Sequence, residues 1–181
     1  DYSSEVATLA AAGGDAVAVI GYLDQGGKGI IQGSLDSGAF DTFILSDGMI
    51  GDSLTDTFGK SLNKSFGSIP GSMGKGAALY TNIANASGST NEVAVGPYTG
   101  ESYDAAALII LAIQAGNSAD RASIAKHVMD VANGPGTKIY PGQLAKALKL
   151  LADGKKIDYE GATGVMFTSV GEAEGSFLEK E

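Results

Sequence analysis

Two short apolar runs that alternate with helical patterns constrain the fold of this chain most strongly. Residues 15–20 (DAVAVI) and 41–45 (DTFIL) carry no charge after their first position, as expected for parallel strands that are covered on both faces. A helical pattern over residues 2–12 precedes the first run, and another over residues 28–37 links the two. Because the connections are short, this alternation predicts an α/β layer with a parallel sheet.

The rest of the chain has a different pattern. Residues 67–76 are rich in Gly, Ser and Pro and predict a connector, while residues 85–100 are polar and predict a loop. The segment 102–115 is apolar nearly all round, so we expect a deeply packed helix there. Weak alternation from residue 161, around 165–170 and again at 176–178, predicts one or two strands. Further helices are expected at residues 52–62, 77–86, 120–133 and 143–153.

Composition excludes several classes of protein. The 181 residues contain no apolar run of 18 or more, which argues against a membrane span. Twelve basic against 21 acidic residues give a net charge of −9, which disfavours a nucleic-acid partner. With no cysteine and one histidine, neither a metal nor a cofactor is expected. The start at Asp1 shows no targeting peptide, so we expect that one was removed or that the chain begins inside a larger protein.

Two loops are site candidates because ligands of parallel sheets bind outside the carboxyl ends of the strands. These loops are Gly21–Gly27 and Ser46–Asp52, and Tyr22 and Asp47 lie close behind the two predicted strands. A carboxylate there can hold an ammonium group, and a tyrosine can cover it or donate a hydrogen bond. The alternative is turn chemistry, since Asp-Gly is a common turn pair. The residues alone leave both interpretations open.

Two short motifs suggest other chemistry. Residues 26–29 (GGKG) suggest a phosphate loop, but the spacing to Gly21 is wrong and no Ser or Thr follows the lysine. Residues 51–54 (GDSL) resemble the block of the GDSL esterases, in which the serine is the nucleophile. That family takes its base from an Asp-x-x-His block, whereas His127 has Ile124 three residues before it. We therefore favour helix capping by Asp52 or Ser53 and a structural role for His127.

A series of blocks in the same order resembles the second lobe of the branched-chain amino-acid (Leu/Ile/Val) binding proteins of ABC transporters and the segments that follow it. These are type I periplasmic solute-binding proteins. No block is decisive by itself, but together they cover nearly the whole chain. The blocks are Val19–Tyr22, Ile44–Gly48, Glu101–Ala106, Val131–Gly136, Tyr140–Gly142 and Ile157–Ala162.

The resemblance implies a fragment of a larger fold. Members have two α/β lobes, and this chain is similar to their C-terminal half. Residues 1–70 would be part of lobe 2, residues 71–168 the mainly helical return into lobe 1, and residues 169–181 a crossing back to lobe 2. Half of such a protein exposes sheet edges and faces. We therefore expect the fragment to self-associate or to pair with the missing half.

The resemblance also implies site residues. Tyr22 matches a tyrosine that lines the cleft, and Asp47 falls where many relatives have the Glu that takes the ligand's α-ammonium. Asp for Glu shortens the reach by about 1.5 Å, which leaves the identity of the ligand open. Tyr103 matches a recurrent family residue, although its place at the start of a buried helix favours packing. The candidate ligand-binding residues are Tyr22, Asp47, Gly21 and Gly48, with Tyr103 and Met49 as further possibilities.

The function implied is that of a periplasmic solute-binding component of an ABC importer. An amino acid or related small molecule would be clamped between two lobes, and the closed state presented to the membrane permease, without catalysis. Two alternatives come from other classes. One is the ligand-sensing domain of a receptor or regulator with the same fold, and the other, less favoured, is a GDSL-type hydrolase.

Overall fold

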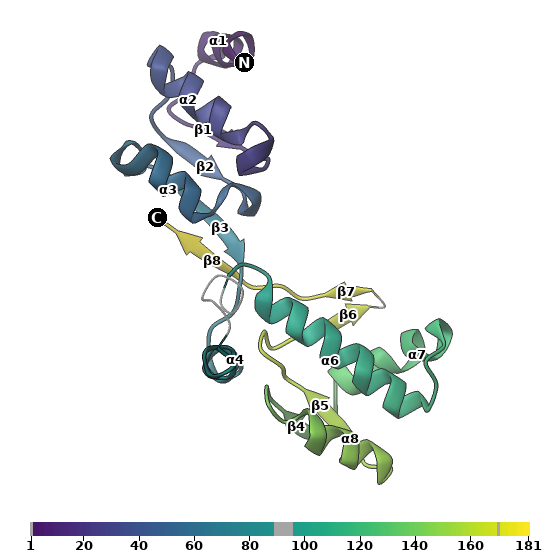
Figure 1. Cartoon of the computed structure of the whole chain (residues 1–181). Helices are drawn as coiled ribbons and strands as arrows, with labels where there is room; N and C mark the ends of the chain where they lie inside the picture. The colour runs from purple at the N-terminus through teal and green to yellow at the C-terminus, as the bar shows by residue number, and fades with distance from the viewer. Residues whose placement is uncertain (1, 89–95, 170) are drawn as a thin grey trace. The chain divides into compact units, whose positions relative to one another are not determined.

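The computed structural model describes residues 2–88, 96–169 and 171–181. The chain forms two compact units, shown in Figure 1. Unit 1 is Asp1–Ile69 with Phe177–Glu181, and unit 2 is Pro70–Ser176. The assignment of residues 1–70, 71–168 and 169–181 to parts of two lobes, which the family resemblance implies, stays a prediction.

Unit 1 is built on a four-stranded sheet in the order β1-β2-β3-β8. β1 pairs with β2 and β2 with β3, both in parallel, which confirms the predicted α/β fold class with a parallel sheet. The 3₁₀ turns Leu23–Gln25 and Asp47–Met49 follow β1 and β2. The elements are α1 (Ser3–Ala12), β1 (Val17–Val19), α2 (Gly27–Ser37), β2 (Phe43–Leu45), α3 (Asp52–Phe58), β3 (Phe66–Pro70) and β8 (Phe177–Lys180).

The core of unit 1 lies on one face of this sheet. Val17, Val19, Phe43 and Leu45 point into a cluster with buried residues of α2 and α3. The strands β1, β2 and β3 follow one another in one direction across the sheet, and parallel strands are joined by right-handed crossovers. The two connecting helices therefore cover the same face. The other face carries Ile44 and Phe66, which are 41% and 43% exposed. The sequence pattern predicted burial on both faces, so this prediction is wrong for the described residues of this chain.

The predicted connector over residues 67–76 is also corrected, since β3 occupies its first part. Gly67 suggested a turn, but its role is close packing between strands. A Cβ at Gly67 would lie 2.8 Å from the backbone oxygen of Leu45 and 2.8 Å from Cδ1 of Ile50. The glycine therefore lets β3 approach the core, a reason that local sequence does not reveal.

Unit 2 is mainly helical, and the helices expected at 77–86, 102–115, 120–133 and 143–153 are confirmed with small shifts of their ends. Two strand pairs accompany them: β4 with β5 in parallel, and β6 with β7 antiparallel. Part of the predicted loop 85–100 and Val170 of the predicted tail strand lie outside the described residues. The elements are α4 (Lys75–Ala86), α6 (Thr99–Gly116), α7 (Arg121–Ala132), β4 (Thr137–Ile139), α8 (Leu144–Ala152), β5 (Ile157–Tyr159), β6 (Phe167–Ser169) and β7 (Glu172–Ala173).

The core of unit 2 forms where α6, α7 and α8 meet β4 and β5. Leu108 and Leu111 of α6 are buried there, but Ile109 and Ile110 are 48% and 41% exposed. The expected deep packing of α6 on all sides is therefore wrong for the described residues, which cover one face of the helix. No helix in the described part of the chain has the length and apolar character needed to cross a membrane.

Candidate functional site

The two loops predicted as a site meet at the carboxyl edge of the sheet in unit 1. Val19 of β1 is in register with Leu45 of β2, so the residues that follow lie side by side. Ser46 joins the two loops. Its N–H donates to the Val19 carbonyl at 3.3 Å, and its hydroxyl lies 3.3 Å from the N–H and 3.4 Å from the carbonyl oxygen of Gly21. Ser46 was not among the predicted site residues, because a serine after a strand carries no signal of such a link.

Gly48 is required by the space between the loops. A Cβ at this position would lie 2.4 Å from the Gly21 carbonyl oxygen and 2.8 Å from Cδ1 of the Tyr22 ring. Any side chain would therefore displace the loop, the ring or both. The Tyr22 ring lies against the Gly48 backbone, which determines where the ring can stand.

The backbone of Tyr22 is fixed by hydrogen bonds, while its ring is exposed. Its carbonyl oxygen accepts hydrogen bonds from the N–H groups of Gln25 and Gly27, at 3.2 and 3.1 Å, so the start of α2 holds this residue in place. The side chain nevertheless remains 64% exposed. A tyrosine ring positioned in this way offers an apolar face and a hydroxyl to a molecule from solvent.

Asp47 begins the 3₁₀ turn after β2 and is half-buried. Its carbonyl oxygen accepts the N–H of Ile50 at 3.0 Å, which is the turn chemistry that the sequence left open. Among the described residues, no hydrogen bond or ion pair engages its carboxylate. A half-buried carboxylate without a partner is an acceptor for an ammonium group or an amide N–H.

Two further candidates have packing roles in the structure. Met49 is fully buried in the core of unit 1, where its Sδ would lie 2.1 Å from a Cβ built on Gly27. This corrects its selection as a ligand contact, because the side chain fills the space that Gly27 leaves open. The Tyr103 ring packs on Tyr80 in unit 2 with centroids 5.4 Å apart, and its hydroxyl accepts the N–H of Gly142 at 3.0 Å.

The phosphate-loop and esterase motifs gain no support. Lys28 pairs with Asp24 at 3.2 Å, one turn earlier on the same surface. Ser53 lies exposed in the first turn of α3, but the residue that caps this helix is Gly51, without a side-chain hydrogen bond. The predicted capping of this helix by Asp52 or Ser53 is therefore wrong.

The single histidine belongs to unit 2. Nδ1 of His127 lies 3.5 Å from a carboxylate oxygen of Asp130 on the same helix, and its ring packs beside Gly116. These contacts fit the structural role predicted for it. Within residues 2–88, 96–169 and 171–181, no group of His, Cys, Asp and Glu is arranged to hold a metal ion.

A buried carboxylate in unit 2 is the feature that sequence reasoning missed. Asp104 of α6 is 2% exposed and accepts four hydrogen bonds. The Tyr159 hydroxyl and the Ala162 N–H donate to Oδ1 at 2.9 and 2.8 Å, and the N–H and hydroxyl of Thr163 donate to Oδ2 at 2.8 Å each. Asp104 therefore ties α6 to the loop that follows β5. Asp104, Tyr159 and Ala162 lie in two of the blocks that carried the family resemblance, and Thr163 directly follows one of them, but nothing in either block shows that they meet.

The surroundings of Asp104 are adapted to it. Gly161 has φ +58°, and a Cβ there would lie 2.3 Å from Oδ1 of Asp104, so only glycine fits. Burial raises the pKa of Tyr159 far above its ordinary value, and the negative charge of Asp104 raises it further. The tyrosine thus stays protonated and keeps donating its hydrogen bond.

Comparison with known proteins decides the fold. No protein-family model matches the chain. The structure superposes on a leucine-binding protein, LivK, from Thermotoga maritima over 99% of this chain, with TM-score 0.67 and 17% identity. It also superposes on a type 1 periplasmic binding protein from Bordetella pertussis over 96% of this chain, with TM-score 0.55 and 16% identity. The chain has part of the type I periplasmic binding fold.

A curated sequence relative agrees with this fold. The chain is 37% identical over 68 residues to the chemotactic signal transduction system substrate-binding protein BasB of Halobacterium salinarum. The match covers 38% of this chain and 16% of that protein. The two solved structures are matched over 44% and 48% of their length. This chain therefore spans less than half of the length of each of these three relatives.

Proposed function

We propose that this chain is part of a solute-binding protein and that unit 1 contacts the solute at the edge formed by Gly21–Tyr22 and Ser46–Gly48. The observation that carries the proposal is the half-buried Asp47 carboxylate, which has no partner among the described residues and adjoins the glycine that supports the exposed Tyr22 ring. This edge is where ligands of parallel sheets bind.

The solute class that fits is a small molecule with an ammonium group, such as an amino acid. The carboxylate of Asp47 would accept hydrogen bonds from the ammonium, and such charge-assisted bonds are about twice as strong as neutral ones. The Tyr22 ring would add a cation–π contact of about 0.5–2 kcal/mol. The similarity to a leucine-binding protein supports this class.

The biological setting that we propose is transport. The protein would act outside the cytoplasm as the binding component of an ABC importer, without catalysis, and would present its closed, solute-bound form to the membrane permease. By itself the 181-residue chain would self-associate or pair with the missing part of the fold. The family resemblance and the shared type I periplasmic binding fold support this setting.

Signal transduction is a second candidate, and one observation favours it. The relative from Halobacterium salinarum is by its name a substrate-binding protein of a chemotactic system. In that case the solute-bound protein would contact a transducer in place of a permease. Affinity purification of the solute-loaded protein from its own membranes separates the two, because a permease supports import and a transducer supports sensing.

The solute class is tested by NMR titration of the chain with three matched probes. These are L-leucine, 3-methylbutylamine, which lacks the carboxylate, and 4-methylpentanoate, which lacks the ammonium. We expect leucine and the amine to shift the ring signals of Tyr22, and 4-methylpentanoate to leave them unchanged. In the Asp47→Asn variant the affinity for leucine, measured from the same shifts, should fall at least about tenfold, which corresponds to about 1.4 kcal/mol.

The matched control is Asp24→Asn, which removes an exposed carboxylate of unit 1 that, unlike Asp47, already pairs with Lys28. This variant should titrate like the unmodified chain. Equal shifts by all three probes, or a shift that persists in Asp47→Asn, would exclude the assignment of Asp47 to the ammonium. A shift by 4-methylpentanoate alone would indicate a solute of another class.

A further inference from the structure

Helix α8 and the turn after it concentrate positive charge in an acidic chain. Residues 144–156 contain four lysines and one aspartate, a net charge of +3. Because the 181 residues together carry −9, the rest of the chain has a net charge of −12. All four lysines are exposed. They are called the α8 lysines below, and they are Lys146, Lys149, Lys155 and Lys156.

The opposite side of α8 is packed within unit 2. Ala147 is fully buried, and Leu144 and Leu148 pack against the core that α8 shares with α6, α7, β4 and β5. Positions that recur every three or four residues form one stripe of a helix. Lys146 and Lys149 stand outside this stripe and are three residues apart, so they are neighbours on the exposed side.

The end of α8 keeps the other two lysines at the same helix. The N–H of Gly154 donates to the Leu151 carbonyl at 3.0 Å, and the N–H of Lys155 donates to the Leu150 carbonyl at 2.9 Å. With Gly154 at φ +72°, these two bonds form a Schellman motif, which reverses the chain at the end of a helix. Lys155 is therefore held at the last turn of α8, and Lys156 follows it directly.

The α8 lysines lack acidic partners. Among the described residues, no ion pair engages them, whereas Lys138 on β4 pairs with Glu160. Lys146 lies in the first turn of α8, which contains no acid. A cation there opposes the helix dipole and is repelled by Lys149, so the stability of the helix does not account for it. Unpaired cations gathered on one surface of an acidic chain fit an anionic partner.

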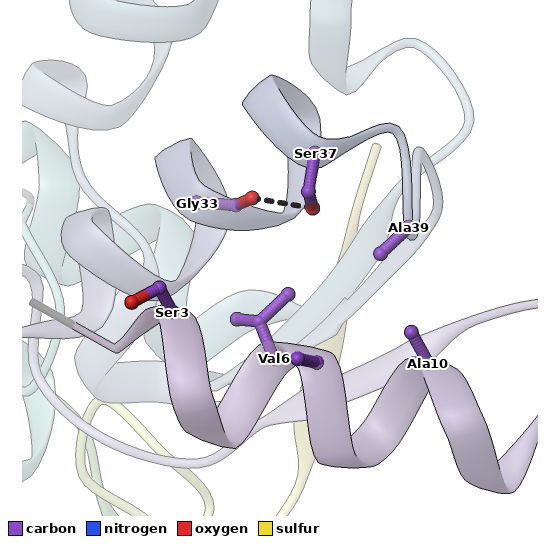
Figure 2. A pocket seen from close by; sticks show the side chains of 7 residues that line it. Ser3, Val6, Ala10, Gly33, Ser37 and Ala39 are labelled. Atoms are coloured by element: carbon purple, nitrogen blue, oxygen red, sulfur yellow. Dashed lines mark hydrogen bonds between the residues drawn. The ribbon is translucent and has the colours of Figure 1, made fainter.

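The composition of this surface favours an anionic bilayer over an acidic protein. Protein interfaces are enriched in arginine and aromatic residues and depleted of lysine, but the cations here are all lysines. Apolar anchors are also absent, since no large apolar side chain within residues 138–156 is exposed. The groove of about 350 Å³ beside Val6 and Gly33 belongs to unit 1, between α1 and α2 (Figure 2). A lysine ammonium is a compact, strongly hydrated charge on a flexible stem, which suits the diffuse field of lipid headgroups.

We propose that the α8 lysines hold unit 2 against an anionic lipid surface. The attraction is electrostatic and reversible, because the apolar side of α8 is packed in the core and does not insert. The same lipids repel the acidic remainder of the chain, so the contact orients the protein with α8 toward the bilayer. The argument rests on the surface of unit 2 and is independent of the proposed solute site.

Co-sedimentation with vesicles tests the proposal. The vesicles are of phosphatidylcholine alone or of phosphatidylcholine with about a third of phosphatidylglycerol, in about 50 mM NaCl. We expect the unmodified chain to bind only the vesicles that contain phosphatidylglycerol, and to be released at about 300 mM NaCl. Replacing all four α8 lysines by glutamine should weaken this binding at least about 30-fold.

The matched control replaces the four lysines of unit 1 by glutamine, which changes the net charge by the same amount. These are Lys28, Lys60, Lys64 and Lys180. The control should bind within about threefold of the unmodified chain, because its α8 lysines are intact. Equal losses in the two variants would attribute the binding to net charge and would overturn the proposal.

A spin label locates the contact, since the chain contains no cysteine that would compete for it. The label is placed at Ala152→Cys on the exposed side of α8, or at Asp56→Cys on the exposed side of α3. A nickel-chelating lipid should relax the label at position 152 at least about tenfold more strongly than the label at position 56. Circular dichroism of each variant verifies that the fold is retained.

Three other outcomes would overturn the proposal. The first is that the unmodified chain does not bind vesicles that contain phosphatidylglycerol. The second is equal relaxation of the labels at positions 152 and 56. The third is binding of the α8 lysines to poly-L-glutamate more tightly than to these vesicles, which would make an acidic protein the partner.

Discussion

Replacing Asp104 by alanine should loosen unit 2 and leave unit 1 unchanged. The variant removes one acceptor group and leaves four donors without it. Two of these, the Tyr159 hydroxyl and the Ala162 N–H, belong to residues that are 2% and 4% exposed, so water cannot readily replace the carboxylate. Each unsatisfied buried donor costs about 1–3 kcal/mol.

The expected loss is therefore about 3–5 kcal/mol, the usual effect of removing one partner from a buried charged cluster. Because domains unfold with about 5–15 kcal/mol in total, this loss is a large fraction of the stability of unit 2. Asp104→Asn is the graded variant. It keeps an oxygen for the donors to Oδ1 but turns an amide toward the Thr163 N–H, so we expect about 1–3 kcal/mol.

Native-state hydrogen exchange followed by mass spectrometry is the suitable assay, because it reports the opening free energy of each segment separately. Peptides from α6 and β5 should lose some protection in Asp104→Asn and more in Asp104→Ala, while peptides from β1 and β2 keep theirs. A loss below about 1 kcal/mol in α6 for Asp104→Ala, or an equal loss in β1, would refute the reasoning.

Three further outcomes follow from single residues. Gly48→Ala should destabilise unit 1 by about 1–3 kcal/mol in urea unfolding and shift the Tyr22 ring signals, and unshifted signals would contradict the contact. The raised pKa of Tyr159 keeps it protonated in the folded state, so above pH 10.0, its ordinary pKa, the free energy of unfolding should fall by about 1.4 kcal/mol per pH unit. The Tyr159→Phe variant should lack this contribution to the slope. Parallel curves of stability against pH for the two proteins would disprove the prediction. Gly33→Ala should raise the melting temperature, because alanine favours a helix over glycine by about 0.5–1 kcal/mol. The added Cβ would lie 3.9 Å from Cγ2 of Val6, which is an ordinary van der Waals contact. A lower melting temperature would show strain at this position.

Much of the fold could be predicted from local patterns. Apolar runs at residues 15–20 and 41–45 predicted β1 and β2, and helical patterns, one of them apolar nearly all round, predicted the helices of unit 2, because both signals depend on neighbours in sequence. β4 and β5 escaped prediction because neither is an apolar run: β4 (TKI) has two exposed positions, and β5 (IDY) carries a charged residue in its middle. β3 was hidden by Gly67, whose purpose is visible only when Leu45 and Ile50 stand beside it.

The candidate site could also be predicted in part from local patterns. Tyr22 and Asp47 follow apolar strands, and the rule for parallel sheets placed them at one edge from sequence alone. The hydroxyl of Ser46 that links the two loops, and the contact of Gly48 with Tyr22, involve residues from different strands. No local pattern contains such information.

The sequence by itself determined the class of fold, the lack of cysteine in the 181 residues and the place of two loops at the carboxyl edge of the sheet. These follow from composition and from patterns within about ten residues. Only the tertiary structure decided that Met49 belongs to the core, that Asp104 joins α6 to the loop after β5, and that Ile44 and Phe66 are exposed on the sheet face opposite the core. The physical reason is that packing and hydrogen bonding join residues by distance in space, and a carboxylate 58 positions from its partner leaves no trace in the pattern around either.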